Sequence, residues 1–190
     1  MKFFREHSGL ILKLFANQIG ITFFALVLTM AVIQMKNDSL KVVVSLFSIV
    51  FYLCLIYSVM WQAGASDIIA IEHGHRPKIS LYPVKVALYA SVPNLLLGVL
   101  LVITCLLGPY AGLSGASAIF AVLHIIAGLF EAMYVGLFSF IIEPLSGNSY
   151  YLVVSLLYVL SSLPLVLMSA AAYALGTRNF GARVKNNNRE

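Results

Sequence analysis

The sequence predicts an all-α fold, a polytopic transmembrane helical bundle. Hydrophobic residues make up 61% of the 190 residues and charged residues only 10%, whereas a soluble globular domain has about 25% charged residues. The mean hydropathy is +0.96. Several apolar stretches also reach the roughly 20 residues that a helix needs to cross a bilayer. No polar segment is long enough for a soluble domain, so we expect one integral membrane domain over residues 1–190.

Four stretches without charged side chains predict complete spans, and they cover residues 14–35, 42–62, 86–107 and 151–175. A further stretch, 118–142, is equally long but contains His124 and Glu131. Glu131 divides it into two apolar pieces of a length that is typical of re-entrant, interfacial or buried segments. We therefore expect four spans plus this ambiguous segment, with a fifth complete span as the alternative.

The positive charges predict how the chain is threaded. Ten of the twelve Lys and Arg residues lie before the first span, in the connector 63–85 or after residue 175, and the other two lie in the connector 36–41. With four spans the ten share one side of the membrane, whereas five spans give no asymmetry. Since positive residues of short connectors stay on the cytoplasmic side, we expect a cell-membrane protein with both termini cytoplasmic.

The connector after the second predicted span holds five of the chain's 19 charged residues. It contains "EHGHRPK", in which His73 and His75 are the only pair with metal-ligand spacing. An H-x-H pair without a second cluster does not complete the four ligands of a zinc site, so we predict no metal and no other cofactor. The basic residues here orient the protein and are suited to anionic lipid headgroups. The partner that composition predicts is the lipid bilayer, with no nucleic acid.

Small and polar residues recur on single helical faces inside the predicted spans. The two stripes are Gln18, Thr22, Ala25 and Thr29 in the first span and Ser155, Ser162 and Ser169 in the last. Such stripes let membrane helices pack closely and hydrogen-bond to one another. We therefore predict that both stripes are buried.

Two prolines interrupt the predicted spans, Pro93 in the third and Pro164 in the last. Each lacks an amide hydrogen and leaves one backbone carbonyl unpaired, so we expect kinks. Asn94 and Ser161 stand close to these prolines. Their side chains are suited to pairing the released groups or to lining a small polar cavity.

Glu131 and His124 are the only ionisable side chains inside the predicted apolar segments. They share one helical face, which we expect to point into the protein. A carboxylate at membrane depth is costly unless it is paired, protonated or wetted, so it indicates a ligand or proton pathway. We predict that Glu131 faces the interior with Gln18, Asn94 or a serine of the last span as neighbours. The alternative is a re-entrant hairpin that places Glu131 and His124 near water.

No motif in the sequence predicts an enzyme. "GLSGAS", residues 112–117, is similar to the nucleophile segment of rhomboid intramembrane proteases, whose serine needs a histidine base on a later membrane helix. The only histidine after Ser114 is His124, in the very next segment. Phosphate-loop, zincin and dinucleotide motifs do not occur, so we expect no catalytic residue and no enzyme.

The chain resembles a family of uncharacterised, small polytopic membrane proteins of Clostridia-type bacteria. The resemblance rests on "NQIGITFFALVLTMA", "WQAGASD", "SVPNLLLGVLL" and "LPLVLMSAAAYALGTR". It implies a bacterial cell membrane and supplies no activity, ligand or site residue.

Two functions fit these observations. The first, slightly favoured, is a non-enzymatic accessory or assembly subunit of a larger membrane complex, because the chain is small, has short connectors and lacks catalytic groups. The second is a small-molecule carrier or the substrate-binding membrane subunit of a transport system, because polar residues and prolines interrupt the spans.

Overall fold

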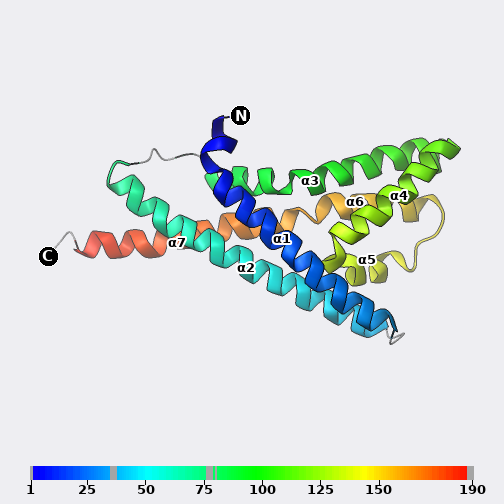
Figure 1. The fold of residues 1–190 in the computed structure, drawn as a ribbon, viewed down its shortest axis with the longest axis horizontal. Helices are drawn as coiled ribbons and strands as arrows, with labels where there is room; N and C mark the ends of the chain where they lie inside the picture. Colours follow the sequence, from blue (N-terminus) through cyan, green and yellow to red (C-terminus); the bar gives the residue numbers. More distant parts are fainter. Residues whose placement is uncertain (1, 35–37, 76–78, 80, 188–190) are drawn as a thin grey trace. The chain divides into compact units, whose positions relative to one another are not determined.

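The computed structural model describes residues 2–34, 38–75, 79 and 81–187. Its elements are α1 (Lys2–Gln34), α2 (Asp38–Glu72), α3 (Tyr82–Cys105), η1 (Leu106–Tyr110), α4 (Ser114–Phe130), η2 (Ala132–Tyr134), α5 (Val135–Ile142), α6 (Asn148–Leu160) and α7 (Leu163–Asn187) (Figure 1). The structure is 90% helical, and no strand occurs among the described residues. The predicted all-α helical bundle is confirmed.

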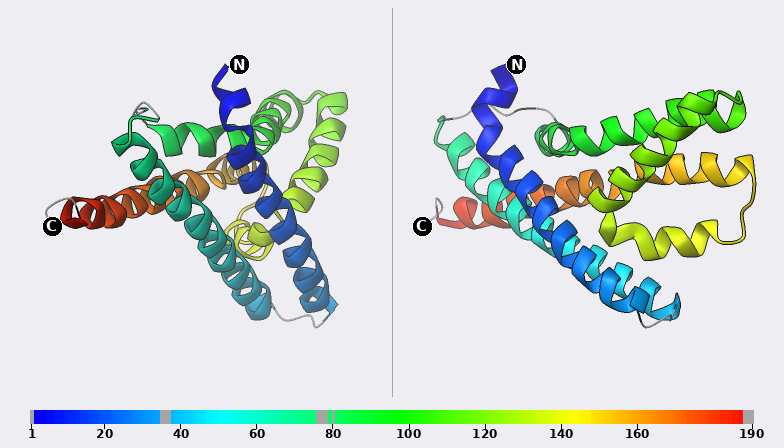
Figure 2. Two further views of the ribbon diagram at one scale, coloured as in Figure 1. Left: turned by 60° about the vertical axis from the view of Figure 1, so that its left-hand side comes forward. Right: turned by 45° about the vertical axis from the view of Figure 1, so that its right-hand side comes forward.

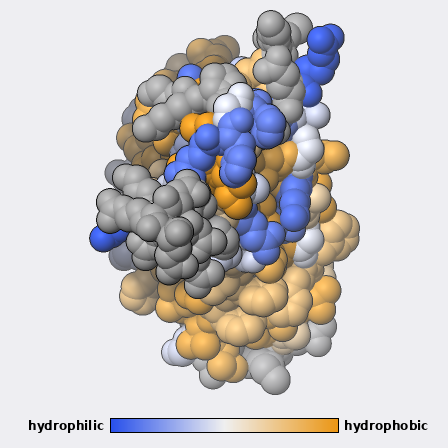
Figure 3. Space-filling view, turned by 90° about the vertical axis from the view of Figure 1, so that its left-hand side faces the viewer, coloured by the Kyte–Doolittle hydropathy of each residue, from blue (hydrophilic) through white to orange (hydrophobic). Residues whose placement is uncertain are grey.

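Four helical segments of the described chain are long and apolar enough to cross a membrane: His7–Val32, Ser39–Glu72, Tyr82–Tyr110 and Asn148–Asn179. They contain most of each span predicted from the sequence. Figure 3 shows large areas of hydrophobic surface, with hydrophilic residues gathered on one part of the face drawn. The chain is thus a helical membrane protein, because such apolar surface is stable against lipid and not against water.

The ambiguous segment forms two helices, α4 and α5, which are bent by 86° at a break. This geometry is that of a broken span or a re-entrant loop, and it brings the possible number of spans to five. Figure 2 shows α4 and α5 as the two arms of a V. The sequence alternative, a fifth complete span, therefore stays open in the form of a broken span, since α4 ends at Phe130 directly before Glu131.

Contacts divide the chain into two compact units, each assembled from distant segments. Unit 1 comprises Met1–Asn17, Leu53–Ala90 and Leu163–Glu190, and unit 2 comprises Gln18–Tyr52 and Ser91–Ser162. The sequence of unit 1 contains ten of the twelve Lys and Arg residues. The boundaries lie within α1, α2 and α3 and at the break between α6 and α7. The expectation of a single domain remains a prediction.

Unit 2 packs closely through glycines. A Cβ on Gly98 of α3 would lie 2.9 Å from the Val159 side chain of α6, and a Cβ on Gly136 of α5 would overlap the Lys41 carbonyl of α2. The polar residues of the first predicted stripe, Gln18, Thr22 and Thr29, are 3%, 9% and 9% exposed, and Ala25 is fully buried. Both predicted stripes are confirmed as buried faces, since Ser155, Ser162 and Ser169 are also buried.

In unit 1, α2 and α7 also pack closely at a glycine. A Cβ on Gly64 would lie 2.5 Å from the Tyr173 carbonyl, and the Tyr173 hydroxyl donates to Asp67 Oδ2 at 3.1 Å. This bond satisfies a carboxylate near the end of α2, so the helix continues to Glu72. The connector predicted from residue 63 is therefore wrong in its first ten residues, which are helical. A turn forms at "HGH", with Gly74 at φ +72°.

The last predicted span lies within Asn148–Asn179 and is interrupted by a two-residue turn. α6 ends at Leu160 and α7 begins at Leu163, so the break falls at Ser161 and Ser162. Pro164 then lies in the first turn of α7, where its missing amide hydrogen costs no helical bond. In α3 the helix continues through Pro93.

Candidate functional site

Glu131 lies at the break between α4 and η2. Its amide donates to the Ala127 carbonyl at 2.8 Å, and its carbonyl accepts from the Tyr134 amide at 2.8 Å. Both backbone groups are therefore paired although the helix ends. Glu131 is the C-terminal cap of α4, with φ −111° and ψ 31°.

The Glu131 carboxyl group is buried inside unit 2, and only 3% of the residue is exposed. Its Oε1 accepts a hydrogen bond from Asn94 Nδ2 of α3 at 2.5 Å and lies 3.1 Å from Ser161 Oγ. The predicted surroundings, an interior position beside Asn94 and a serine of the last span, are confirmed. Oε2 has no hydrogen-bond partner among the described residues. One carboxyl oxygen thus anchors the group while the other keeps its acceptor capacity.

Ser161 connects the carboxyl group to the break after α6. Its hydroxyl has one hydrogen to donate and two acceptors in reach, the Tyr158 carbonyl at 2.7 Å and Glu131 Oε1 at 3.1 Å. The Ser161 carbonyl accepts from the Tyr134 hydroxyl at 3.3 Å. Because a helix that ends leaves its last carbonyls without intrahelical partners, the break supplies polar groups inside an otherwise apolar span.

α1 reaches the other break through Thr22, whose hydroxyl donates to the Phe130 carbonyl at 2.8 Å. Gln18 lies one turn earlier on the same buried face. Within the described chain no hydrogen bond joins Gln18 to Glu131, and Gln18 Oε1 has no partner there. The predicted residue Gln18 therefore belongs to the correct face, but the contact of α1 with the break is made by Thr22.

His124 lies among aromatic side chains. It is half-buried on α4, and its ring centroid is 6.0 Å from that of Phe120 and 5.8 Å from that of Tyr158. Tyr158 is also close enough to Glu131 to interact with its charge. The two residues that the sequence places in one pathway thus lie in different but adjoining surroundings, one aromatic and one polar.

Sequence reasoning missed the contribution of α2 to this site. Ser45 Oγ accepts from the Gly136 amide at 2.8 Å, and the buried phenol of Tyr52 interacts electrostatically with Glu131 and Tyr134. Ser48, fully buried between them, has no hydrogen-bond partner for its hydroxyl among the described residues. Ser45, Ser48 and Tyr52 have the spacing i, i+3 and i+7, which places them on one helical face. This spacing is visible in the sequence and predicts that the three residues face the same neighbours.

The histidines of the connector do not gain further metal ligands. His73 and His75 are exposed, with ring centroids 6.3 Å apart. His73 Nδ1 lies 2.8 Å from the Ile69 carbonyl of its own helix. Among the described residues, no group of three or more His, Cys, Asp or Glu side chains is placed to hold a metal ion.

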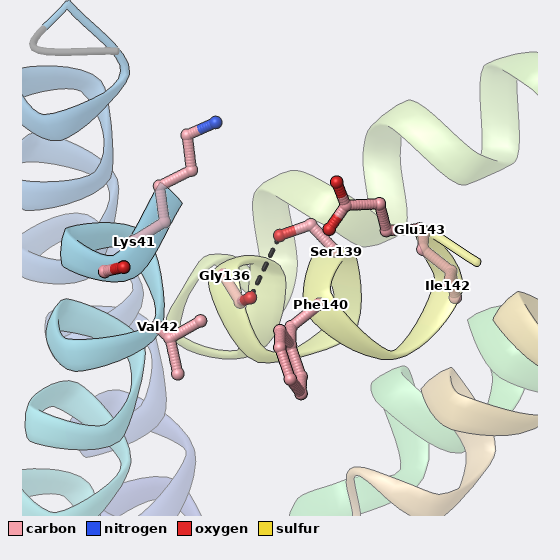
Figure 4. Close-up of a pocket in the computed structure, with 8 residues that line it drawn as sticks. Lys41, Val42, Gly136, Ser139, Phe140, Ile142 and Glu143 are labelled. Carbon is pink, nitrogen blue, oxygen red and sulfur yellow. Dashed lines mark hydrogen bonds between the residues drawn. The ribbon is translucent and has the colours of Figure 1, made fainter. Parts of the chain in front are cut away.

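Each unit also has an open pocket. The pocket in unit 2, about 710 Å³, lies between α2 and α5 and is lined by Ser39, Lys41, Val42, Gly136, Ser139, Phe140, Ile142 and Glu143. Figure 4 shows the Lys41 and Glu143 side chains on its two sides. The pocket in unit 1, about 480 Å³, includes His7, Lys13, Asp67 and Tyr82. Neither pocket is lined by Glu131.

The chain was compared with protein-family models, curated proteins and solved structures. None of the three comparisons finds a match. The chemistry of the Glu131 site therefore stands on its geometry: a buried carboxyl group between two helix breaks, held by an amide and a hydroxyl.

Proposed function

We propose that this protein is a small-molecule carrier, or the substrate-binding membrane subunit of a transport system, whose solute path passes Glu131. The observation that carries the proposal is the carboxyl group itself, which is 3% exposed and has one oxygen without a partner among the described residues. A buried acceptor without a donor costs about 1–3 kcal/mol. Packing alone does not require that cost, so the group favours a role in binding.

The two helix breaks beside the carboxyl group support the same proposal. Glu131 caps the C-terminal end of α4, Ser161 caps that of α6, and their side chains lie 3.1 Å apart. Discontinuous helices that present polar groups inside the membrane are typical of the binding sites of secondary transporters. We place the protein in a bacterial cell membrane with both termini cytoplasmic, as the positive charges and the family resemblance favour. The proposed role is not enzymatic.

Access of water to the site tests this function. In a background with Cys54→Ala and Cys105→Ala, the variant Ser161→Cys is reconstituted into vesicles. A membrane-impermeant, cationic methanethiosulfonate is then supplied from outside or trapped inside. A carrier opens its site to water, where a thiol ionises and reacts. We expect modification of Ser161→Cys from at least one side, measured by mass spectrometry.

The matched control is Leu160→Cys, because Leu160 precedes Ser161 and is 50% exposed on the outer surface of the helix. In lipid this thiol stays protonated, so we expect it to remain unmodified. Absence of modification of Ser161→Cys from both sides would overturn the carrier function. Recovery of the protein within a larger complex from mild detergent would then support the accessory or assembly subunit instead.

A further inference from the structure

The buried polar atoms of unit 2 that lack hydrogen-bond partners are all oxygens. Among the described residues of this unit they are Gln18 Oε1, Ser48 Oγ, Asn94 Oδ1 and Glu131 Oε2. Amide and carboxylate oxygens accept hydrogen bonds or coordinate cations, and they do not donate. The four residues are at most 6% exposed. The missing partner of the three amide and carboxylate oxygens is therefore a donor or a positive charge, whereas the Ser48 hydroxyl is itself able to donate.

These oxygens lie on faces that converge on the break at Glu131. Asn94 contacts Glu131 directly. Gln18 is one turn from Thr22, which contacts the Phe130 carbonyl. Ser48 lies one turn from Tyr52, whose phenol is near enough to interact with the Glu131 charge. Three further helices thus direct acceptors towards one segment.

Two helices also end at the same place. The C-terminal end of a helix carries a partial negative charge and favours cations over carboxylates. Glu131 and Ser161 cap two such ends, α4 and α6, and their side chains are in contact. Glu131 also precedes η2, so helix ends of both signs lie beside its carboxyl group.

No Lys, Arg or His in the described part of unit 2 is hydrogen-bonded to Glu131 Oε2. Lys41 is the one described Lys or Arg of unit 2, and it lines the pocket between α2 and α5 together with Gly136 and Glu143 (Figure 4). The phenols of Tyr52, Tyr134 and Tyr158 lie near Glu131, and the His124 ring lies against Tyr158. Phenols are neutral or negative and ordinarily ionise near pH 10.

We propose that Glu131 Oε2 and Asn94 Oδ1 bind a small monovalent cation, Na⁺ or a proton. The cation neutralises the carboxyl group at the two helix ends. Its coupling to solute movement rests on the carrier function proposed above, whereas the binding itself does not. Helix C-terminal ends and unwound carbonyls hold Na⁺ or protons in secondary transporters, and an oxygen-only site suits both cations.

Binding of ²²Na⁺ to the purified, full-length protein in detergent tests the sodium form. We expect saturable binding by wild type and at least about tenfold weaker binding by Glu131→Gln, since Gln keeps the shape and removes the charge. Glu143→Gln is the matched control, because Glu143 is an exposed carboxylate just after α5. It should bind as wild type does.

Infrared spectroscopy tests the proton form on the same variants. If Na⁺ does not bind, we expect wild type and Glu143→Gln to show the C=O stretch of a protonated carboxyl at neutral pH, and Glu131→Gln to lack it. Absence of both signals would overturn the cation site. Sodium binding or a protonated carboxyl group, without modification of Ser161→Cys, would show that the cation only stabilises the structure. That result would refute the carrier function. Modification of Ser161→Cys, without sodium binding and without a protonated carboxyl group, would support the carrier function and refute the cation site.

Discussion

At the level of single residues, the contact of Thr22 with the Phe130 carbonyl is the simplest to isolate. Thr22→Val removes the hydroxyl and keeps the shape, so it leaves a carbonyl at the break without its donor. We expect the free energy of unfolding in mixed micelles to fall by about 1 kcal/mol, the usual size of a hydrogen bond between membrane helices.

Thr104→Val is the matched control for this change. The Thr104 hydroxyl donates to carbonyls of its own helix, those of Leu100 and Leu101. The substitution removes no hydrogen bond between helices, so the free energy of unfolding should change little. Equal effects of the two substitutions would show that Thr22 does not support the break.

The residue level also shows what sequence alone can predict about the site. Glu131 was found because a carboxylate in an apolar segment is rare and costly, and Asn94 because it stands beside a proline in a span. Thr22 and Ser48 were not distinguished from other small polar residues, because hydroxyl side chains occur in most membrane helices. Their partners depend on which helices meet, and only the structure determines that.

At the level of elements, the approach of α5 to α2 depends on Gly136. A Cβ there overlaps the Lys41 carbonyl, and the Gly136 amide donates to Ser45. We expect Gly136→Ala to lower the unfolding free energy by about 1–3 kcal/mol, because the packed helices must separate. Thermal unfolding in detergent, followed by circular dichroism, measures the effect.

Gly20→Ala provides the comparison within a helix. Gly20 lies in α1 with no atom within 4 Å of an added Cβ. Alanine favours the helix over glycine by about 1 kcal/mol, so this variant should be neutral or slightly more stable. If both alanine substitutions lowered the stability, the effect of Gly136→Ala could not be assigned to the close contact between α5 and α2.

The sequence predicted the positions of the membrane spans better than the bounds of the helices, for a physical reason. Long uncharged runs determine where helices cross the membrane, and these were found. The bounds were less accurate, since helices continue beyond the hydrocarbon wherever their polar groups are satisfied, as Asp67 is by Tyr173. The break at Ser161 was expected as a kink at Pro164, because a proline predicts an interruption nearby without specifying its form.

At the level of the whole molecule, the testable property is orientation. Ten of the twelve Lys and Arg residues lie in segments that four spans would place on one side, so both termini should be cytoplasmic. A green fluorescent protein fused after residue 190 should fluoresce, and alkaline phosphatase at the same position should be inactive. An active phosphatase fusion would contradict the four-span topology.

The two partners of the Glu131 side chain also impose an order on synthesis. Asn94 is 37 residues before Glu131, and Ser161 is 30 residues after it. A ribosome that adds about 5–20 residues per second needs roughly 2–6 s to pass from Glu131 to Ser161. Glu131 therefore reaches the membrane before Ser161 does, when Asn94 is the one partner within reach. A product that terminates before Ser161 never gains the second, so we expect membrane proteases to remove it faster than the complete protein.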